Sequence, residues 1–349
     1  MVRKLIVAAL LIIVTTGAVL AWMIWRPETG FDKEKQTVYI GTGKTDKLNV
    51  LSVLTDSLVI THPGNFEKLA NRMDMWPRIR PGKYEFKKGM NILEIARKLR
   101  NGQQSTVDLV ITKIRTKEQL ARLVGRRFET DSLTMINFLN NEDSLESYSI
   151  DTTTLLSIIF PNTYTYYWTA GPRTILDKLY KEHEKFWNEE RKQKAAAKGM
   201  TEIEVYTMAS IIEEETNHDP EKELMASVYQ NRIKKGIPLG ADPTIKYAMR
   251  NFGLTRILRV HTRTPSPYNT YLNKGLPPGP ICTPSVASID AVLNAPETKY
   301  LFFVANSDFS QRHIFTENYS DHLKYAREYQ KALTEWQKRK RAEAQNSGQ

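Results

Sequence analysis

The sequence predicts an α+β protein with an N-terminal transmembrane helix, a small α+β module and a larger mixed α+β domain. Three observations lead to this prediction. An apolar run near the N-terminus is long enough to cross a membrane, short strand-like segments alternate with helical periodicity after it, and amphipathic helices dominate the C-terminal half. With 349 residues, 41% hydrophobic and 26% charged, the chain has room for two domains with ordinary cores.

Composition excludes several kinds of site. Cys282 is the only cysteine, so the chain has neither a disulfide framework nor a cysteine cluster for zinc. The six histidines are scattered and none has metal-binding spacing. The net charge of +11 favours an anionic partner such as nucleic acid, lipid head groups or an acidic polymer. Nucleic acid is disfavoured by the location that the N-terminus predicts.

Residues 5–25 form the predicted transmembrane helix, because they are uncharged, mostly apolar and about as long as a bilayer is thick. Arg3 and Lys4 precede the run, so the positive-inside rule places residues 1–4 in the cytoplasm and the remainder outside. A cleaved signal peptide is the alternative. The run ends in Ala-Trp-Met-Ile-Trp, which is a poor cleavage site and favours a retained single-pass anchor.

Residues 26–36 are polar and form a predicted tether, and the small module follows over residues 37–104. Its predicted helices cover residues 48–59, 66–73 and 91–99, and a turn at Arg80-Pro-Gly leads into a strand. Gly41-Thr-Gly-Lys-Thr45 has the end of a phosphate-binding loop. The pattern needs a glycine where Val38 stands, so we expect an ordinary turn.

The larger domain is predicted over residues 105–335, and residues 336–349 form a basic polar tail. A strand at 107–112 with a helix at 116–124 comes first, followed by a helix at 131–139. One long amphipathic helix is expected over 173–198. Two further helices, at 202–216 and from Asp219-Pro220 to Gly236, have clear start and stop residues.

The helix at 202–216 ends in three consecutive glutamates. On a helical wheel Glu213 and Glu215 flank the apolar stripe and are expected to be half-buried, whereas Glu214 points away and is expected to be solvated. Burial raises a carboxyl pKa toward neutrality, which suits a general acid. Spacing does not choose between Glu213 and Glu215, and such a triplet is also typical of an exposed helix face.

Other catalytic patterns are missing from the sequence. It has no G-x-S-x-G elbow and no S-x-x-K, so a serine acyl-enzyme has no support. Cys282 lies in the turn-rich segment Pro-Gly-Pro-Ile-Cys-Thr-Pro without a nearby base, which is typical of a structural thiol.

Seven segments over residues 160–322 stand out as a series of motifs. The segments are Phe160-Pro-Asn-Thr-Tyr164, Ala209-Ser-Ile-Ile-Glu-Glu-Glu-Thr216, Ala226-Ser-Val-Tyr-Gln-Asn-Arg-Ile233, Ala241-Asp-Pro-Thr-Ile-Lys-Tyr247, Tyr268-Asn-Thr-Tyr271, Gly275-Leu-Pro-Pro-Gly-Pro-Ile281 and Arg312-His-Ile-Phe-Thr316. They resemble motifs of the endolytic murein transglycosylase family, the YceG-like proteins. They occur in the family's order, and it is their succession that makes the resemblance specific.

The resemblance implies a fold, a reaction and a catalyst. The small module would be LysM-like, and the enzyme would cut bonds between N-acetylmuramic acid and N-acetylglucosamine in nascent peptidoglycan, leaving 1,6-anhydro ends. Glu213 falls on the family's catalytic glutamate, and no metal or cofactor is required. The substrate-binding candidates are the polar residues of the other motifs: Asn231, Asp242, Thr244, Tyr268, Asn269, Tyr271 and His313.

The implied setting is the bacterial cytoplasmic (inner) membrane, with the catalytic domain facing the periplasm or cell exterior. The expected partners are peptidoglycan glycan strands, the membrane itself and peptidoglycan synthases. Two alternatives stay open: a non-catalytic glycan-binding scaffold of the wall-synthesis machinery, and a lysozyme-like hydrolase with Asp242 or Glu215 as second carboxylate.

Two positions depart from the family pattern. Gly240 replaces a glutamine before the Asp-Pro-Thr motif, which would remove a substrate contact. Ser285 replaces a turn glycine after Pro284. Neither change is expected to affect Glu213.

Overall fold

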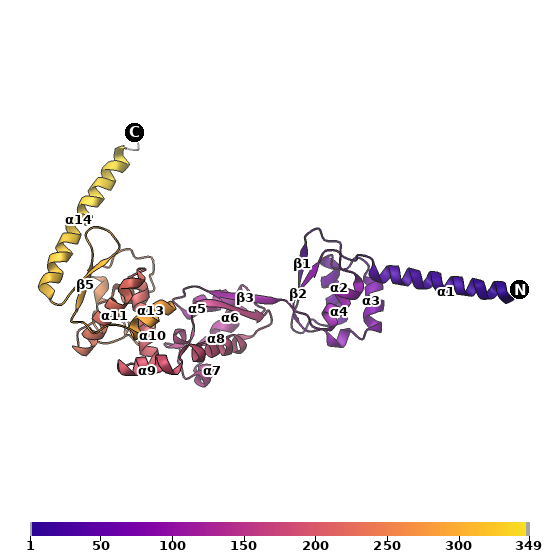
Figure 1. Cartoon of the computed structure of the whole chain (residues 1–349), viewed down its shortest axis with the longest axis horizontal. Helices are drawn as coiled ribbons and strands as arrows, with labels where there is room; N and C mark the ends of the chain where they lie inside the picture. Colours follow the sequence, from indigo (N-terminus) through magenta and orange to yellow (C-terminus); the bar gives the residue numbers. More distant parts are fainter. Residues whose placement is uncertain (1, 347–349) are drawn as a thin grey trace. The chain divides into compact units, whose positions relative to one another are not determined.

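The computed structural model describes residues 2–346 and divides the chain into two compact units. The first contains residues 1–109, 123–135 and 164–172; the second contains 110–122, 136–163 and 173–349. Both mix helices with short two-stranded sheets, so the predicted α+β class is confirmed (Figure 1).

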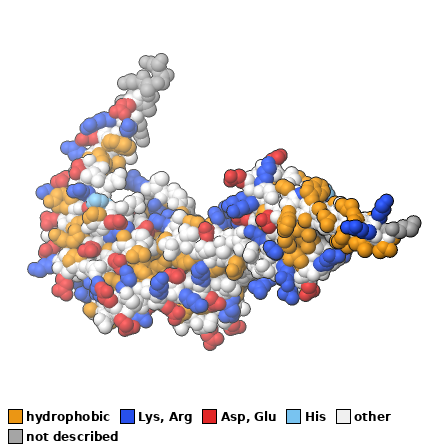
Figure 2. Space-filling view, turned by 45° about the vertical axis from the view of Figure 1, so that its right-hand side comes forward, with side chains coloured by type: hydrophobic (Ala, Val, Ile, Leu, Met, Phe, Trp, Pro, Cys, Tyr) orange, Lys and Arg blue, Asp and Glu red, His pale blue; other side chains and the backbone are white. Residues whose placement is uncertain are grey.

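Helix α1 (Val2–Trp25) opens the first unit and confirms the predicted apolar helix. By length and composition it is able to cross a membrane. Figure 2 shows hydrophobic side chains along this helix, and Leu5, Leu11 and Ile13 are each more than half exposed. Helices of signal sequences have a similar length and composition, so the membrane anchor itself stays a prediction.

The rest of the first unit is a small sheet covered by helices. Strands β1 (Lys35–Ile40) and β2 (Gly82–Lys87) pair antiparallel, with Val38 opposite Tyr84. The helical elements are α2 (Lys47–Asp56), α3 (Pro63–Arg72), the 3₁₀ turn η1 (Trp76–Arg78) and α4 (Ile92–Arg100). Asn91 caps α4 in a reciprocal capping box with Glu94, as its position before an apolar repeat predicts.

The segment predicted as a tether contains buried side chains. Glu28 is 1% exposed and accepts hydrogen bonds from the backbone N–H groups of Thr61 at 3.0 Å and His62 at 2.6 Å. Phe31 packs into the same core as the two strands. Residues 26–36 therefore contribute to the folded module.

Four further elements each have residues in both units. They are β3 (Thr106–Ile111), α5 (Lys117–Gly125), α6 (Ser132–Asn140) and β4 (Asn162–Tyr167). Strands β3 and β4 form a two-stranded sheet.

The second unit is mostly helical. Its remaining elements are α7 (Glu142–Leu145), η2 (Glu146–Tyr148), η3 (Leu155–Ile158), α8 (Pro172–Phe186), α9 (Glu189–Ala197), α10 (Glu202–Glu215), α11 (Asp219–Lys234), α12 (Asp242–Ala248), η4 (His261–Arg263), α13 (Val286–Leu293), β5 (Phe302–Ala305), β6 (His313–Thr316) and α14 (Tyr319–Asn346). Strands β5 and β6 pair antiparallel.

The single helix predicted over 173–198 is wrong, because the structure has two helices there. Trp187 is 2% exposed and sits in the core at the break between them. The Asn188 side chain then accepts a hydrogen bond from the Arg191 N–H at 3.0 Å and starts α9 as its N-cap.

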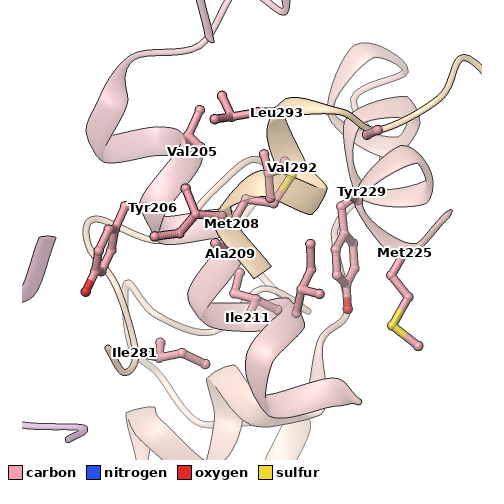
Figure 3. Close-up of a cluster of buried hydrophobic side chains, with 14 of the residues drawn as sticks. Val205, Tyr206, Met208, Ala209, Ile211, Met225, Tyr229, Ile281, Val292 and Leu293 are labelled. Atoms are coloured by element: carbon pink, nitrogen blue, oxygen red, sulfur yellow. The ribbon is translucent and has the colours of Figure 1, made fainter. Parts of the chain in front are cut away.

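Helix α10 forms the centre of this unit and packs against α11, α12 and α13. Val205, Met208, Ala209 and Ile212 of the predicted apolar stripe are fully buried, but the remaining residues from Tyr206 to Ile211 are buried as well, so the helix is enclosed on all faces. Figure 3 shows their neighbours from α11 and α13, including Tyr229. This packing fixes the direction in which the C-terminal turn of α10 presents its glutamates.

Candidate active site

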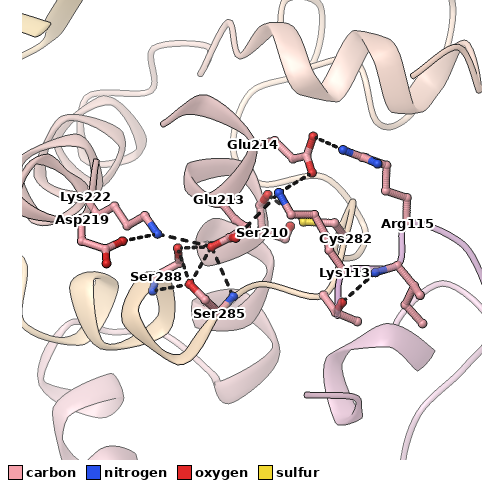
Figure 4. Close-up of polar contacts among 12 residues, drawn as sticks. Lys113, Arg115, Ser210, Glu213, Glu214, Asp219, Lys222, Cys282, Ser285 and Ser288 are labelled. Carbon is pink, nitrogen blue, oxygen red and sulfur yellow. Dashed lines mark hydrogen bonds and ion pairs between the residues drawn. The ribbon is translucent and has the colours of Figure 1, made fainter. Parts of the chain in front are cut away.

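The three glutamates occupy the last turn of α10, where the helix dipole is unfavourable to negative charge. Such a cluster needs cations or hydrogen-bond donors from elsewhere. The structure supplies them from three separate segments: residues 113–115, α11 and the start of α13 (Figure 4). None of these partners was predicted from the sequence.

The carboxyl of Glu213 is held by two serines and two lysines. Its Oε2 atom accepts hydrogen bonds from Ser288 Oγ at 2.6 Å and from Ser285 Oγ at 2.7 Å and N at 3.2 Å. The Nζ atoms of Lys222 and Lys113 lie 3.4 and 3.7 Å from the carboxylate oxygens. The side chain is 14% exposed, so it lies at the surface of the fold without projecting into solvent.

These contacts reverse the expected direction of the Glu213 pKa. Burial raises the pKa, but the hydrogen bonds from Ser288 and Ser285 and the charge of Lys222 outweigh it, and the net pKa lies below the usual glutamate value. The expectation that partial burial would raise the pKa of Glu213 is therefore wrong. Glu213 is a carboxylate at neutral pH in this arrangement.

Lys222 is buried, which is rare for a lysine. Its side chain is 5% exposed and lies between two carboxylates, with Asp219 at 2.7 Å and Glu213 at 3.4 Å. The two negative groups compensate the buried ammonium. Lys222 therefore ties the first turn of α11 to the last turn of α10.

The prediction that Glu214 is solvated is wrong. Its side chain is 15% exposed and forms ion pairs with Arg115 at 2.9 Å and Lys113 at 3.3 Å. Lys113 thus bridges Glu213 and Glu214. The helical wheel missed this because the cations come from a segment about 100 residues earlier in the chain.

Glu215 lies in a second polar cluster. It accepts a hydrogen bond from the hydroxyl of Tyr229 at 2.9 Å. Although a small part of the side chain is exposed, protein atoms surround the carboxyl, and this burial raises its pKa to about 7, with the charge of Asp242 adding to the effect. Of the two glutamates between which the helical spacing did not choose, Glu215 has the raised pKa and Glu213 has the lowered one.

Asp242 and Tyr271, two predicted substrate-binding residues, are in contact beside this cluster. The Tyr271 hydroxyl donates to Asp242 Oδ1 at 2.6 Å, and 38% of Tyr271 is exposed. Tyr268, a third, packs its ring 4.6 Å from that of Tyr247 and is partly buried. Tyr271 therefore keeps a surface that a ligand can contact.

Thr244 and Asn269 are fully buried, so their observed contacts are structural. Thr244 Oγ1 donates to the Ala241 carbonyl at 2.7 Å. Asn269 Nδ2 donates to the carbonyls of Thr262 at 3.0 Å and Thr264 at 2.7 Å. Both residues hold the loop between α12 and α13 in shape.

Asn231 and His313 also hold other segments. Asn231 Nδ2 donates to the carbonyls of Thr298 at 2.9 Å and Tyr300 at 3.0 Å, and the residue lines a cavity of about 690 Å³. His313 begins β6, and Glu221 contacts its N–H at 2.8 Å and its Nδ1 at 2.9 Å. Within residues 2–346, the hydrogen bonds and ion pairs of Glu213 described above involve none of the seven predicted binding residues.

The two departures from the family pattern differ in consequence. Gly240 has φ of +59°, a left-handed conformation that disfavours a side chain. Ser285 caps α13 and contacts Glu213, so the expectation that neither departure affects Glu213 is wrong for Ser285.

Within the described residues, no group of three or more His, Cys, Asp or Glu is placed to hold a metal ion. The site presents two carboxyl groups with different surroundings. Glu213 is ionised and strongly hydrogen-bonded, whereas Glu215 titrates near neutrality.

The family model described as "YceG-like family" matches residues 38–328, which include every residue of this site. The chain belongs to the YceG-like family. The match begins in β1 and ends within α14, so it covers most of both units.

Two relatives of the chain are both named endolytic murein transglycosylase. The chain is 31% identical over 266 residues to an endolytic murein transglycosylase of Bacillus subtilis, covering 71% of this chain and 72% of that protein. It is 26% identical over 276 residues to an endolytic murein transglycosylase of Streptococcus pneumoniae, covering 70% of this chain and 49% of that longer protein.

A solved structure has a related fold. The crystal structure of a putative YceG-like protein from Listeria monocytogenes superposes with a TM-score of 0.55 at 26% identity. The likeness covers 84% of this chain and 99% of that one. The fold assignment therefore agrees with the family match.

Proposed function

We propose that this protein is an endolytic peptidoglycan lytic transglycosylase that uses Glu213 as its single acid/base. The family match and the two relatives named endolytic murein transglycosylase support the activity. The observation that carries the choice of Glu213 is its carboxyl, partly buried and held by donors from α11 and α13 at the end of α10.

In the proposed reaction, protonated Glu213 gives its proton to the oxygen that links N-acetylmuramic acid to N-acetylglucosamine. The C–O bond breaks and the anomeric carbon becomes electron-deficient. The resulting Glu213 carboxylate then removes the proton of the muramyl 6-hydroxyl, whose oxygen closes on that carbon. No water is consumed, the product is a 1,6-anhydro end, and one carboxyl suffices where an ordinary glycosidase uses two.

The resting carboxylate must gain a proton before the first step. Glycan binding is expected to displace water from the exposed part of Glu213, which penalises the charged form and raises the pKa. The serine and lysine partners set the low starting point from which this rise occurs. Enzyme activity should therefore fall as the pH rises above the pKa that Glu213 has in the glycan-bound complex.

The test is Glu213→Gln in the full chain, purified in detergent and incubated with peptidoglycan. Glutamine keeps the size of the side chain but cannot donate and then accept a proton, so we expect release of anhydro-ended fragments to fall at least about a thousand-fold. Mass spectrometry of the soluble products measures this. Glu215→Gln is the matched control and should retain most activity.

Other results would reassign the chemistry. Full activity of Glu213→Gln with loss in Glu215→Gln would make Glu215 the catalyst. Reducing ends in place of anhydro ends would indicate a lysozyme-like hydrolase, with Asp242 or Glu215 as the second carboxylate. An unchanged polymer with the native protein would indicate a glycan-binding scaffold.

The setting is proposed on the same basis. Helix α1 would be a single-pass anchor in the cytoplasmic membrane, with the catalytic unit outside the cell membrane. The β1–α2–α3–β2 module would be LysM-like and hold glycan. Peptidoglycan synthases, which make the nascent strands, are the proposed protein partners.

A further inference from the structure

We propose that Ser285 is a positioning residue for Glu213, which fixes the oxygen Oε2 and leaves Oε1 to exchange the proton with the glycan. The proposal rests on the proposed function, in which Glu213 is the acid/base. It concerns a position where this chain has serine in place of the turn glycine expected from its family resemblance.

The donors around Glu213 are distributed unequally between its two oxygens. Oε2 receives Ser288 Oγ at 2.6 Å, Ser285 Oγ at 2.7 Å, Ser285 N at 3.2 Å and Lys222 Nζ at 3.4 Å. Oε1 is approached within the described residues by Lys113 Nζ at 3.7 Å, beyond hydrogen-bond distance. The carboxyl is therefore anchored through one oxygen.

The Ser285 hydroxyl has one proton, and the geometry shows where it goes. As the N-cap of α13, Ser285 Oγ accepts the Ser288 N–H at 3.4 Å, which uses a lone pair and not the proton. Ser288 Oγ is a further possible acceptor at 3.3 Å, but the charged carboxylate is closer at 2.7 Å and is the stronger acceptor. The proton points to Glu213.

An oxygen that accepts from both serines is unsuited to carry a proton itself. A proton on Oε2 would face the Ser285 and Ser288 donors and would break at least one of their hydrogen bonds. Protonation at Oε1 keeps all of them. The same contacts fix the side-chain rotamer, so Oε1 meets the glycosidic oxygen in a constant direction.

Charged groups cannot be altered here without changing several interactions at once. The titratable and charged groups that face Glu213 or its lysine partners are Lys113, Arg115, Glu214, Asp219, Lys222 and Cys282. The Ser285 hydroxyl is neutral, so its removal leaves this set unchanged. It isolates the contribution of one hydrogen bond.

The experiment compares four variants of the full chain in detergent. Ser285→Ala and Ser285→Gly remove the hydroxyl and keep the backbone N–H, whereas Ser285→Thr retains a hydroxyl. Asn188→Ala is the matched control, because it removes an N-cap side chain from α9 and makes none of the contacts to Glu213. It reproduces the loss of a helix cap alone.

Two measurements are made on each variant. Carbon-13 NMR follows the Glu213 carboxyl through a pH titration, with the resonance identified by its loss in Glu213→Gln. Steady-state kinetics on peptidoglycan strands give kcat and KM across the same pH range.

For Ser285→Ala and Ser285→Gly we expect the midpoint of the Glu213 NMR titration to rise toward that of a free glutamate. The fall of kcat/KM on the high-pH side of its pH profile should move to higher pH by the same amount. On the low-pH plateau, kcat should fall about ten-fold with KM nearly unchanged, because orientation is lost and binding is not. Ser285→Thr should restore both values, and Asn188→Ala should leave both at the native values.

An unchanged Glu213 midpoint in Ser285→Ala and Ser285→Gly would overturn the proposal, as would equal effects in Asn188→Ala. Failure of the proposed function has a different signature. If Glu213→Gln stays active, the kinetic limb is not that of Glu213, yet the NMR titration still decides whether Ser285 holds its carboxylate.

Discussion

Glu213 and Glu215 are two residues apart, yet their carboxyls experience opposite electrostatic surroundings. Glu213 receives hydrogen bonds from two serines and faces two lysines, and the serines together with the charge of Lys222 lower its pKa. Glu215 receives one hydrogen bond from Tyr229. Burial has the largest effect on its pKa and raises it to about 7. Sequence proximity does not make these groups equivalent.

Glu215→Gln should change how stability depends on pH. A carboxyl whose folded-state pKa is raised favours folding below its unfolded pKa, near 4.5, and loses that contribution as pH rises to about 7. The native protein should therefore lose on the order of 3 kcal/mol between pH 4 and pH 8 from this group. Glutamine still accepts from Tyr229 and does not titrate.

Thermal unfolding at the two pH values tests this. We expect the native protein to lose several °C of Tm relative to Glu215→Gln on going from pH 4 to pH 8. An equal change in both proteins would show that Glu215 titrates near its ordinary value.

The sequence predicted the acidic turn but not the groups around it. A 3.6-residue period correctly predicted that Glu213 and Glu215 are partly buried, but it wrongly predicted a solvated Glu214. Lys113, Lys222, Ser285 and Ser288 come from three segments that meet only in the folded chain. The two serine hydroxyls and the charge of Lys222 decide the direction of the Glu213 pKa, so the pattern of one helix could not predict it.

At the scale of elements, most helix boundaries followed from local chemistry. Asn91 and Thr201 cap α4 and α10 with reciprocal glutamates, and Gly236 follows the end of α11 with φ of +63°. The break between α8 and α9 was missed because Trp187 and Asn188 continue a helical pattern in sequence. Only the buried position of Trp187 and the cap formed by Asn188 reveal the break.

The loop between α12 and α13 depends on Asn269. Its Nδ2 donates to the carbonyl of Thr262 in η4 and to that of Thr264. Its Oδ1 accepts a hydrogen bond from the Tyr271 N–H at 2.9 Å. Asn269→Ala leaves these partly buried groups without their partner and should cost about 2 kcal/mol of stability. Because Asn269 is 0% exposed, we expect KM for glycan to change only through Tyr271, which it positions.

Chemical denaturation of the variant measures the stability loss. Asn273→Ala is the comparison, since its amide makes similar bonds from a more exposed side chain and should cost less. A native midpoint for Asn269→Ala, combined with a large rise in KM, would favour direct contact with substrate.

At the scale of the whole molecule, the proposed membrane location of the protein depends on α1. If the helix is a retained anchor, the full chain should stay in the membrane pellet after carbonate extraction, and its intact mass should include residues 2–25. Replacing Leu11 and Ile13 with lysine should release it, because charges near the bilayer centre are costly. A shorter mature protein would identify a cleaved signal sequence.

The two units differ in how far the sequence described them. Family motifs over residues 160–322 lie in the second unit apart from residues 164–172, and they fixed the reaction class. The first unit has few such motifs, so its elements were predicted from periodicity and caps, and its glycan-binding role is still a prediction. The sequence did not predict that residues 26–36 pack into the folded module. Their polar composition suggested a tether, but the buried Glu28 carboxylate accepts hydrogen bonds from the backbone N–H groups of Thr61 and His62.

The single cysteine has a practical consequence. Cys282 has no exposed surface, its Sγ lies 3.4 Å from the Ser210 carbonyl, and burial raises its pKa well above the usual thiol value. Maleimide reagents attack accessible thiolates, so the native chain should give almost no background labelling while folded. Fluorophores or spin labels placed on introduced surface cysteines would then report on individual sites without any need to replace Cys282.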